Sequence, residues 1–174
     1  KIIRKAKETM EIYAPLADRM GMNKIRDELE DLSFSVLNTP ARDLIIDRLK
    51  FIKNNREDTF KIVAAELIDL LKKNGINAKI AGREKTPFSI WRKIQNKKIS
   101  LEQLTDIIGF RILVSSIDDC YKTLGIFHNK FSAIPGKFKD YISTPKINKY
   151  KSIHTSVIGP KKNRIEIQIR TSEM

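Results

Sequence analysis

The segment NRIEIQIRT, from Asn163 to Thr171, alternates isoleucine with polar side chains so strictly that it predicts a β-strand. Successive side chains of a strand point to opposite faces of the sheet, so one face here is apolar and the other presents Glu166, Gln168 and Arg170 in a row. The alternation predicts a sheet with one buried face. It leaves open whether the polar row only meets solvent or forms part of a functional site.

A second strand with the same period, SIHTSVIG, precedes this segment at residues 152–159. The intervening GPKKN is predicted to be a hairpin loop. With Gly159–Asn163 as that loop, His154 lies opposite Gln168 and shares a face with Glu166. A lone histidine on a polar sheet face is more often a surface residue, but several polar groups converging on one face favour a functional site.

The rest of the sequence predicts a helical first third and then a mixture of strands and helices. Helices are predicted over residues 4–21, 23–37, 40–74, 87–98 and 116–131, and strands over residues 76–82, 106–115, 152–159 and 164–170. A break of the long helix at KNNRED stays open. Turn residues without a clean period predict a long loop over residues 134–151. We expect an α/β fold of the α+β kind, a mixed sheet flanked by helices behind a helical N-terminal part.

Apolar residues recur at helical spacing, and we expect the stripe of the helix over residues 87–98 to be buried. In the helix over residues 23–37 the stripe consists of Ile25, Leu29, Leu32 and Val36. In the helix over residues 40–74 the apolar residues are Leu44, Phe51, Val63, Leu67, Leu70 and Leu71. In the helix over residues 87–98 the stripe consists of Phe88, Trp91 and Ile94.

The charge balance is strongly basic, with 34 basic and 21 acidic residues and a formal charge of +13. It favours phosphate-rich partners, whether nucleic acid, nucleotides or an anionic membrane surface. The single cysteine, Cys120, has no disulfide partner and no Cys/His spacing that suits zinc, which fits a reduced, cytoplasmic setting. No apolar run approaches the ~20 residues of a membrane helix. Because the chain opens at Lys1 without a methionine, we expect a fragment of a longer protein.

A basic cluster surrounds the predicted helix start in GREKTPFSIWRK, where we expect the helix to begin near Thr86. Its members are Arg83, Lys85, Ser89, Arg92 and Lys93. Free backbone N–H groups and the helix dipole favour anions at such a place, so the cluster would suit a polyphosphate. The alternative is a solvated basic helix face, and the local sequence favours it.

Two further segments carry candidate groups. In TDIIGFRILV, Asp106 stands at the start of a strand, and Arg111 within that apolar strand needs a carboxylate or a phosphate as partner. It is an equally good interpretation that Asp106 only caps a helix or turn and that Arg111 only belongs to an ordinary salt bridge. In the long loop cations are interleaved with Tyr150, a combination that suits base stacking and phosphate binding and would also suit RNA; they are Lys137, Lys139, Lys146 and Lys151. A loop tyrosine is more often a packing anchor.

Together these segments resemble the synthetase domain of the RelA/SpoT-type long alarmone enzymes, the (p)ppGpp synthetases of the bacterial stringent response. The resemblance runs through YAPLADRMGMNKIRDELEDLSF, GREKTPFSIWRK, DIIGFRILV, DDCYKTLGIFH, IPGKFKDYISTPKINKYKSIHTSVIGP and IEIQIRTSEM. It implies a nucleotidyltransferase-like mixed sheet. It also implies that residues 1–38 form a helical linker from a missing upstream domain and that residues 39–174 form the synthetase domain.

The activity implied by the resemblance is a GTP pyrophosphokinase, which moves the β,γ-pyrophosphate of ATP onto the 3′-hydroxyl of GDP or GTP with Mg²⁺. Asp106 resembles the magnesium ligand, and Glu166 resembles its partner carboxylate and the group that takes the proton from the attacking hydroxyl. The residues implied for ATP are Arg83, Lys85, Ser89, Arg92, Lys93 and Arg111, with Arg83 near the adenine. The residues implied for GDP or GTP are Lys139, Lys146, Asn148, Tyr150, His154, Gln168 and Arg170, with Tyr150 stacked on guanine.

Several departures from the family pattern limit this expectation. Lys149 stands where the family usually has glycine before the stacking tyrosine, and a positive φ there would cost a lysine on the order of 1 kcal/mol or more. The motif KFKD keeps the basic form that goes with bifunctional relatives, yet neither His128 nor His154 is followed by aspartate, as the hydrolase metal motif requires. We therefore expect no hydrolysis, no ribosome sensing, no membrane contact and no direct nucleic-acid partner. The rival hypotheses are an inactive remnant that binds guanine nucleotide and a basic RNA-binding module.

Overall fold

The computed structural model describes residues 1–83, 85–98, 100–101 and 107–174, and the chain divides into two compact units. The first, here called the helical unit, comprises Lys1–Asn54, Lys85–Thr105 and Ile147–Lys149. The second, here called the sheet unit, comprises Asn55–Glu84, Asp106–Lys146 and Tyr150–Met174. Each is described by itself below. The predicted division after residue 38 is a separate matter and stays a prediction.

The helical unit begins with an almost unbroken run of helix. Its segments are α1 (Ile2–Glu8), the π-helical turn η1 (Thr9–Tyr13), α2 (Ala14–Arg19), α3 (Asn23–Leu37), the first part of α4 (Thr39–Lys73) and α5 (Pro87–Lys97). The first stretch of helix, from α1 through α2, ends at Gly21, as predicted. The φ of 74° at Gly21 is the left-handed conformation that closes a helix. The long helix α4 continues through KNNRED, and the division between the units falls inside it, after Asn54.

The core of the helical unit is built by α3, α4 and α5. Phe34, Ile45 and Ile90 are buried there, and the predicted stripe of α5 packs against them. The ring centroids of Phe34 and Phe88 lie 5.5 Å apart in an edge-to-face arrangement, which is a favourable geometry for aromatic pairs. This part of the prediction is confirmed, because Phe88, Trp91 and Ile94 all join the cluster.

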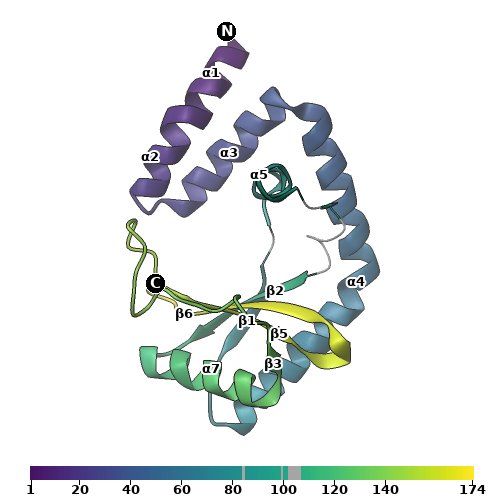
Figure 1. The fold of residues 1–174 in the computed structure, drawn as a ribbon, viewed down its shortest axis with the longest axis vertical. Coiled ribbons are helices and arrows are strands. Elements are labelled where there is room, and N and C mark those ends of the chain that lie inside the picture. Colours follow the sequence, from purple (N-terminus) through teal and green to yellow (C-terminus); the bar gives the residue numbers. More distant parts are fainter. Residues whose placement is uncertain (84, 99, 102–106) are drawn as a thin grey trace. The chain divides into compact units, whose positions relative to one another are not determined.

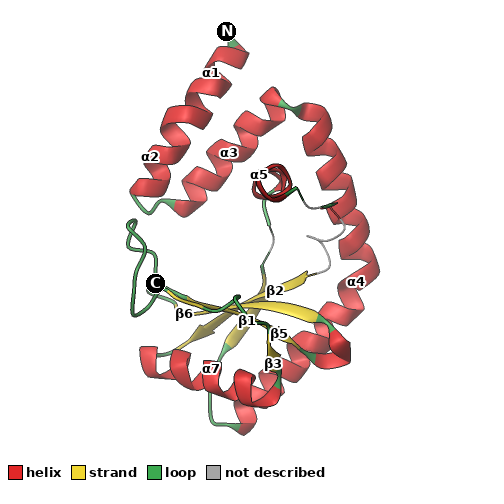
Figure 2. Cartoon of the chain, viewed as in Figure 1, coloured by secondary structure: helices red, strands yellow, loops and turns green. Residues whose placement is uncertain are grey.

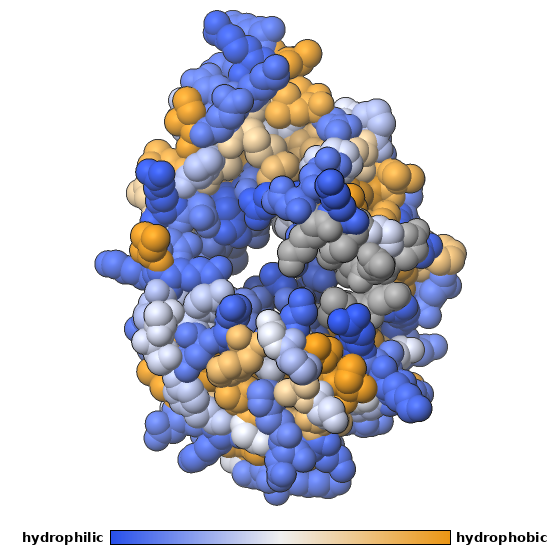
Figure 3. Space-filling model, in the orientation of Figure 1, coloured by the Kyte–Doolittle hydropathy of each residue, from blue (hydrophilic) through white to orange (hydrophobic). Residues whose placement is uncertain are grey.

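The apolar stripe of α3 is not the face that this helix buries. Ile25, Leu32 and Val36 are exposed, and the residues that α3 buries are Glu30, Ser33 and Phe34. In α4 the apolar residues Leu44 and Phe51 are likewise 68% and 56% exposed. The periodicity identifies an apolar stripe correctly, but the side of the helix that a neighbouring helix covers decides which side chains are buried. Hydrophobic surface therefore remains visible over the N-terminal helices in Figure 3.

The described part of the sheet unit contains one sheet with the strand order β1-β2-β6-β5-β3, and β4 also pairs with β5. The strands are β1 (Lys79–Gly82), β2 (Ile107–Val114), β3 (Ser132–Ala133), β4 (Lys139–Asp140), β5 (Ile153–Ile158) and β6 (Arg164–Thr171). Figure 2 shows strands in yellow and helices in red. Strands β2 and β6 run parallel and the other pairs are antiparallel. The loop between β5 and β6 is a hairpin connection containing the short turn η2 (Pro160–Lys162), as predicted. The predicted long loop contains β4, which the sequence did not indicate.

One face of this sheet is covered by α7 (Ile117–Lys130) and by the second half of α4 (Figure 1). Its buried side chains are Val63, Leu67, Leu71, Phe110, Ile112, Cys120, Phe127, Ile153, Val157, Ile165, Ile167 and Ile169. Phe60 of α4 stacks on Phe110 of β2 with ring centroids 4.7 Å apart. The apolar face that the alternation predicts is therefore the core of this unit, and His154 of β5 and Glu166, Gln168 and Arg170 of β6 lie on the other face. No helix in the described ranges is long and apolar enough to cross a membrane.

Candidate functional site

The polar face of the sheet gathers the candidate groups of three strands. The register pairs His154 of β5 with Gln168 of β6, as predicted, and Ser156 with Glu166. The parallel pairing adds β2, which places Arg111 beside Gln168. Paired positions share a face of the sheet, so an acid, an imidazole, an amide and a guanidinium lie on one side of three adjacent strands. Sequence reasoning found the β5–β6 half of this surface and missed that β2 borders β6.

Glu166 is held beside Arg83. The carboxylate oxygen Oε1 lies 3.2 Å from the guanidinium Nη1, and both side chains are largely covered. The backbone N–H of Arg83 donates to the carbonyl of Gly109 at 2.9 Å, which extends the β1–β2 pairing by one step. A Cβ on Gly109 would lie 3.2 Å from the carbonyl oxygen of Arg83, so a side chain there would crowd this approach. Arg83, directly after β1, thus places its guanidinium beside the carboxylate of Glu166 on β6.

His154 is a neutral base within this face. Its Nε2 lies 2.9 Å from the hydroxyl of Tyr150. Burial lowers the pKa of His154 to about 4, and Arg83 lowers it further while Glu166 opposes the shift. The imidazole therefore carries no charge at neutral pH and acts there as a hydrogen-bonding group.

Tyr150 is surrounded by cations and rings. Lys146 Nζ lies 5.3 Å and Arg170 Cζ lies 5.6 Å from the centre of its ring. The rings of Tyr141 and His154 meet it edge to face. Cations placed over aromatic rings at such distances are attracted to the π-face. An aromatic ring flanked by cations is the combination that stacks on a base and neutralises its phosphates.

The start of the long loop is fixed to the sheet unit through Asp140. Its carboxylate accepts hydrogen bonds from the backbone N–H groups of Ile142 and Ser143 and from the hydroxyl of Tyr121 on α7. Burial would raise the pKa of Asp140, but these hydrogen bonds lower it on balance. Next to it, Lys139 of β4 pairs in register with His154 and so adds a cation to the polar face.

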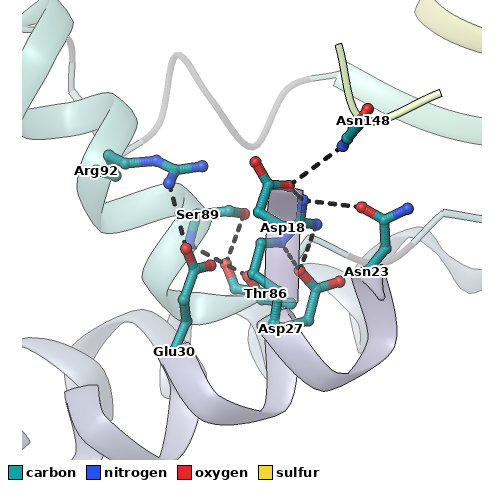
Figure 4. A network of polar contacts seen from close by, with 9 residues as sticks. Asp18, Asn23, Asp27, Glu30, Thr86, Ser89, Arg92 and Asn148 are labelled. Carbon is teal, nitrogen blue, oxygen red and sulfur yellow. Dashed lines mark hydrogen bonds and ion pairs between the residues drawn. The ribbon is translucent and has the colours of Figure 1, made fainter. Parts of the chain in front are cut away.

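In the helical unit, the start of α5 has the geometry predicted for it. The side chain of Thr86 caps the helix by accepting from the N–H of Ser89 at 3.2 Å (Figure 4). The guanidinium of Arg92 lies 3.3 Å from the carboxylate of Glu30 on α3, and Arg92 itself is about half exposed. Burial raises the pKa of Glu30, and Arg92 opposes that shift.

Glu30 is a residue that sequence reasoning missed. A signal for it exists, since Phe34 is the aromatic residue of α3 and marks its buried face, and Glu30 lies one turn before it. A carboxylate at such a place requires a partner, because an unpaired buried charge is costly. The cation cluster of α5 supplies that partner.

A second network in the helical unit reaches the tip of the long loop. Arg26 Nη1 lies 2.6 Å from Asp18, and the same guanidinium holds Asp27 and Asn23 (Figure 4). Burial alone would lower the pKa of Arg26, but the hydrogen bonds to Asp27 and Asp18 raise it on balance. The amide of Asn148 donates to Asp18 at 3.5 Å, the outer limit of a hydrogen bond.

The residues predicted from the sequence are therefore distributed over both units. The sheet unit holds Arg83, Arg111, Lys139, Lys146, Tyr150, His154, Glu166, Gln168 and Arg170. The helical unit holds Lys85, Ser89, Arg92, Lys93 and Asn148. The predicted magnesium ligand Asp106 lies outside the described residues, so its role stays a prediction.

The described side chains offer a single carboxylate on the polar face of β2, β5 and β6 as a candidate metal ligand, Glu166. Within the described ranges no group of three or more His, Cys, Asp or Glu side chains could hold a metal ion. This donor set does not suit zinc, which takes four nitrogen or sulfur ligands. It fits Mg²⁺, which keeps several waters and takes one or two carboxylates together with phosphate oxygens.

A basic sheet face with one carboxylate and a cation-flanked tyrosine points to the class of nucleotide-binding proteins. The model of the region found in RelA/SpoT proteins matches residues 82–174. The chain therefore belongs to the RelA/SpoT family.

Curated relatives extend the similarity to the whole chain. It is 49% identical over 174 residues to the GTP pyrophosphokinase rsh of Brucella melitensis, and it spans 23% of that protein. It is 48% identical over 170 residues to the guanosine-3′,5′-bis(diphosphate) 3′-pyrophosphohydrolase of Aquifex aeolicus and spans 24% of it. The chain thus corresponds to about a quarter of each of these proteins, which carry names of two opposite reactions.

Among solved structures, the small alarmone synthetase 1 of Bacillus subtilis, bound to its product pppGpp, is similar with a TM-score of 0.53 and 25% identity. The match covers 72% of this chain and 74% of that one. The fold seen here is therefore that of an alarmone synthetase.

Proposed function

We propose that this chain is the synthetase part of a RelA/SpoT protein and transfers the pyrophosphate of ATP to the 3′-hydroxyl of GDP or GTP. The observation that carries the proposal is the polar sheet face, where Glu166 lies beside Arg83 and in register with Gly109 and Ser156. A rigid sheet holds a reacting group more firmly than a loop would. Residues 39–174 form the synthetase domain in this proposal, and residues 1–38 lead into it from upstream.

The guanine nucleotide is assigned to the sheet unit. Tyr150 stacks on the base, and Lys146 and Arg170, both within 6 Å of its ring centre, neutralise phosphates. Lys139, His154 and Gln168 border the same face. The neutral His154 suits this place because it can bind a ribose or base group without adding charge.

ATP is assigned to the cations around α5. The cap at Thr86 leaves backbone N–H groups of the first turn and the helix dipole directed toward an anion. Lys85, Ser89, Arg92 and Lys93 add donors to a triphosphate. Glu30 holds the guanidinium of Arg92, which limits its rotamers before the nucleotide binds.

Glu166 is the group proposed to accept the proton of the attacking 3′-hydroxyl. A ribose hydroxyl is a poor nucleophile at neutral pH, and a carboxylate within hydrogen-bond reach assists the attack. Glu166 and Asp106 would hold Mg²⁺, which when bound neutralises charge on the transferred phosphates. The remaining work of this chain is alignment and charge neutralisation, which account for most of catalysis in phosphoryl-type transfer.

The relative named as a hydrolase raises the opposite reaction. We do not extend it to this chain, because the metal-binding His-Asp motif expected for hydrolysis does not occur in the sequence. We place the synthetase reaction in the cytoplasm, in the stringent response, with ATP and GDP or GTP as partners.

The test follows radiolabelled phosphate groups of ATP into the reaction products. The chain is incubated with GDP or GTP, Mg²⁺ and ATP labelled either at the γ- or at the α-phosphate, and products are separated by thin-layer chromatography. Pyrophosphate transfer predicts γ-label in (p)ppGpp and α-label in AMP alone. A guanosine product that carries α-label, or no labelled guanosine product, would overturn the proposal.

A second candidate function is supported by Lys149, whose φ of 60° strains a lysine at the residue before Tyr150. It is an inactive remnant that binds guanine nucleotide without turnover. Calorimetric titration separates the two, because GDP binding without product formation supports the remnant. The RNA-binding alternative predicts binding that falls steeply with salt and is indifferent to GTP.

A further inference from the structure

The tip of the guanine loop packs against the turn between α2 and α3. Gly21 forms this turn with a φ of 74°. A Cβ built on Gly21 would lie 3.2 Å from the carbonyl oxygen of Asn148, which is tighter than ordinary contact. Glycine is thus required there twice, once for the left-handed backbone and once for the approach of the loop.

Asp18 contacts the same loop residue through its side chain. The Asn148 amide donates to Asp18 Oδ1, and this oxygen also accepts from Arg26 at 2.6 Å. Arg26 is itself fixed by Asp27 at 2.6 Å and Asn23 at 3.0 Å. Asp18 is therefore held in place by the helical unit before it meets the loop, so its own hydrogen bond costs little further side-chain entropy.

The segment that makes these contacts is a short part of the helical unit, and the chain returns to the sheet unit directly after it. Ile147–Lys149 belongs to the helical unit, and the sheet unit resumes at Tyr150. The N–H of Lys146 donates to the carbonyl of Tyr150 at 3.2 Å, which closes the loop around this tip. The tip Ile147–Lys149, which contains Asn148, is thus held by contacts with Asp18 and Gly21 inside the helical unit.

We propose that Asp18 and Gly21 are positioning residues for the guanine nucleotide, acting through Asn148, which the family resemblance assigns to GDP or GTP. The inference rests on the proposed function, since it takes the occupant of this loop to be GDP or GTP. Asp18, Gly21 and Asn148 all belong to the helical unit, so the inference concerns contacts within that unit.

The test is a double-mutant cycle read out by GDP binding. Calorimetry measures Kd for GDP in the wild type, in Asp18→Ala, in Asn148→Ala and in the double variant. Loss of a single long hydrogen bond predicts a roughly threefold higher Kd for Asp18→Ala. If Asp18 acts through Asn148, the same substitution has no further effect in the Asn148→Ala background.

Two further variants separate positioning from folding. Asp27→Ala removes another partner of Arg26 without touching the loop, so it should change thermal stability and leave Kd for GDP unchanged. Gly21→Ala introduces both strain and the close contact, so Kd for GDP should rise roughly tenfold while KM for ATP stays constant.

The outcomes distinguish this inference from the proposed function. Additive effects of Asp18→Ala and Asn148→Ala, or equal effects of Asp18→Ala and Asp27→Ala on Kd, would overturn the positioning role while leaving the synthetase assignment intact. Failure of the wild type to bind GDP at all would overturn the assignment and, with it, this inference.

Discussion

In the sheet unit the polar groups are placed by strand register, whereas in the helical unit they are placed by ion pairs between helices. Glu166 and His154 owe their common face to the alternation of β5 and β6. Arg92 of α5 is held by an ion pair with Glu30 of α3, and Asn148 of the loop is held by a hydrogen bond with Asp18 of α2. The difference teaches that the sheet supplies a fixed surface for the reaction, and that the helical unit holds its nucleotide-binding side chains through contacts that single substitutions can remove.

The largest effect is expected at the carboxylate of the sheet. Glu166→Gln keeps the size of the side chain but removes the base, so kcat should fall by about 10²- to 10⁴-fold with little change in nucleotide binding. Steady-state kinetics measure it, and Glu173→Gln, an exposed carboxylate just past β6, is the matched control. Wild-type turnover in Glu166→Gln would remove the sheet from the chemistry.

Removal of the stacking ring should have the next largest effect. Tyr150→Ala should weaken GDP binding by roughly 10- to 100-fold, as loss of one base–aromatic stack costs about 1–3 kcal/mol. Tyr150→Phe keeps the ring and removes the hydroxyl that contacts His154, so its Kd should stay near the wild-type value. Titration of GDP into both variants is the measurement. Equal losses in the two would show that the hydroxyl, and not the ring, carries binding.

A smaller effect concerns the pH dependence of folding in the sheet unit. His154 has a pKa of about 4 when folded, below the value of about 6.5 in an unfolded chain. The unfolded chain therefore binds a proton first as the pH falls, and the contribution of His154 to stability is complete above pH ~6.5 and is lost between there and pH ~4. Urea unfolding should show a steeper fall of the unfolding free energy over this window in wild type than in His154→Gln. Parallel curves would contradict the burial argument.

The smallest effect is expected at the junction of the two units. Lys149→Gly relieves a φ of 60° and should raise the unfolding free energy by at most about 1 kcal/mol, since glycine also has more unfolded-state entropy to lose. Chemical denaturation measures it, with Lys151→Gly as the control for loss of a lysine without a positive φ. A decrease in stability would mean that the lysine side chain contributes more than its backbone costs.

Much of the sheet could be predicted because its information is local. Alternation and one loop length fix the register of His154 against Gln168, and a turn signal fixes the end of the helix at Gly21. The parallel pairing of β2 with β6 could not be predicted in this way, since no short loop connects these strands and their order depends on the whole fold. The sequence therefore indicates Arg111 as a candidate site residue but does not indicate that Gln168 of β6 lies beside it.

The helical unit was harder to predict because its contacts depend on which helices meet. The stripe of α3 is real in the sequence, but α5 covers the side that carries Glu30 and Phe34. The positive φ of Lys149 was anticipated from the glycine of the family, and the structure confirms it. Nothing in the local sequence connects Asn148 with Asp18, 130 residues earlier.

The most direct test of this division is one set of four KM values. KM for ATP and KM for GDP are measured in Arg92→Ala, which alters the helical unit, and in Arg170→Ala, which alters the sheet unit. The account predicts that Arg92→Ala raises KM for ATP roughly tenfold and leaves KM for GDP within about twofold, and that Arg170→Ala does the reverse. Equal increases of both KM values in both variants would contradict it.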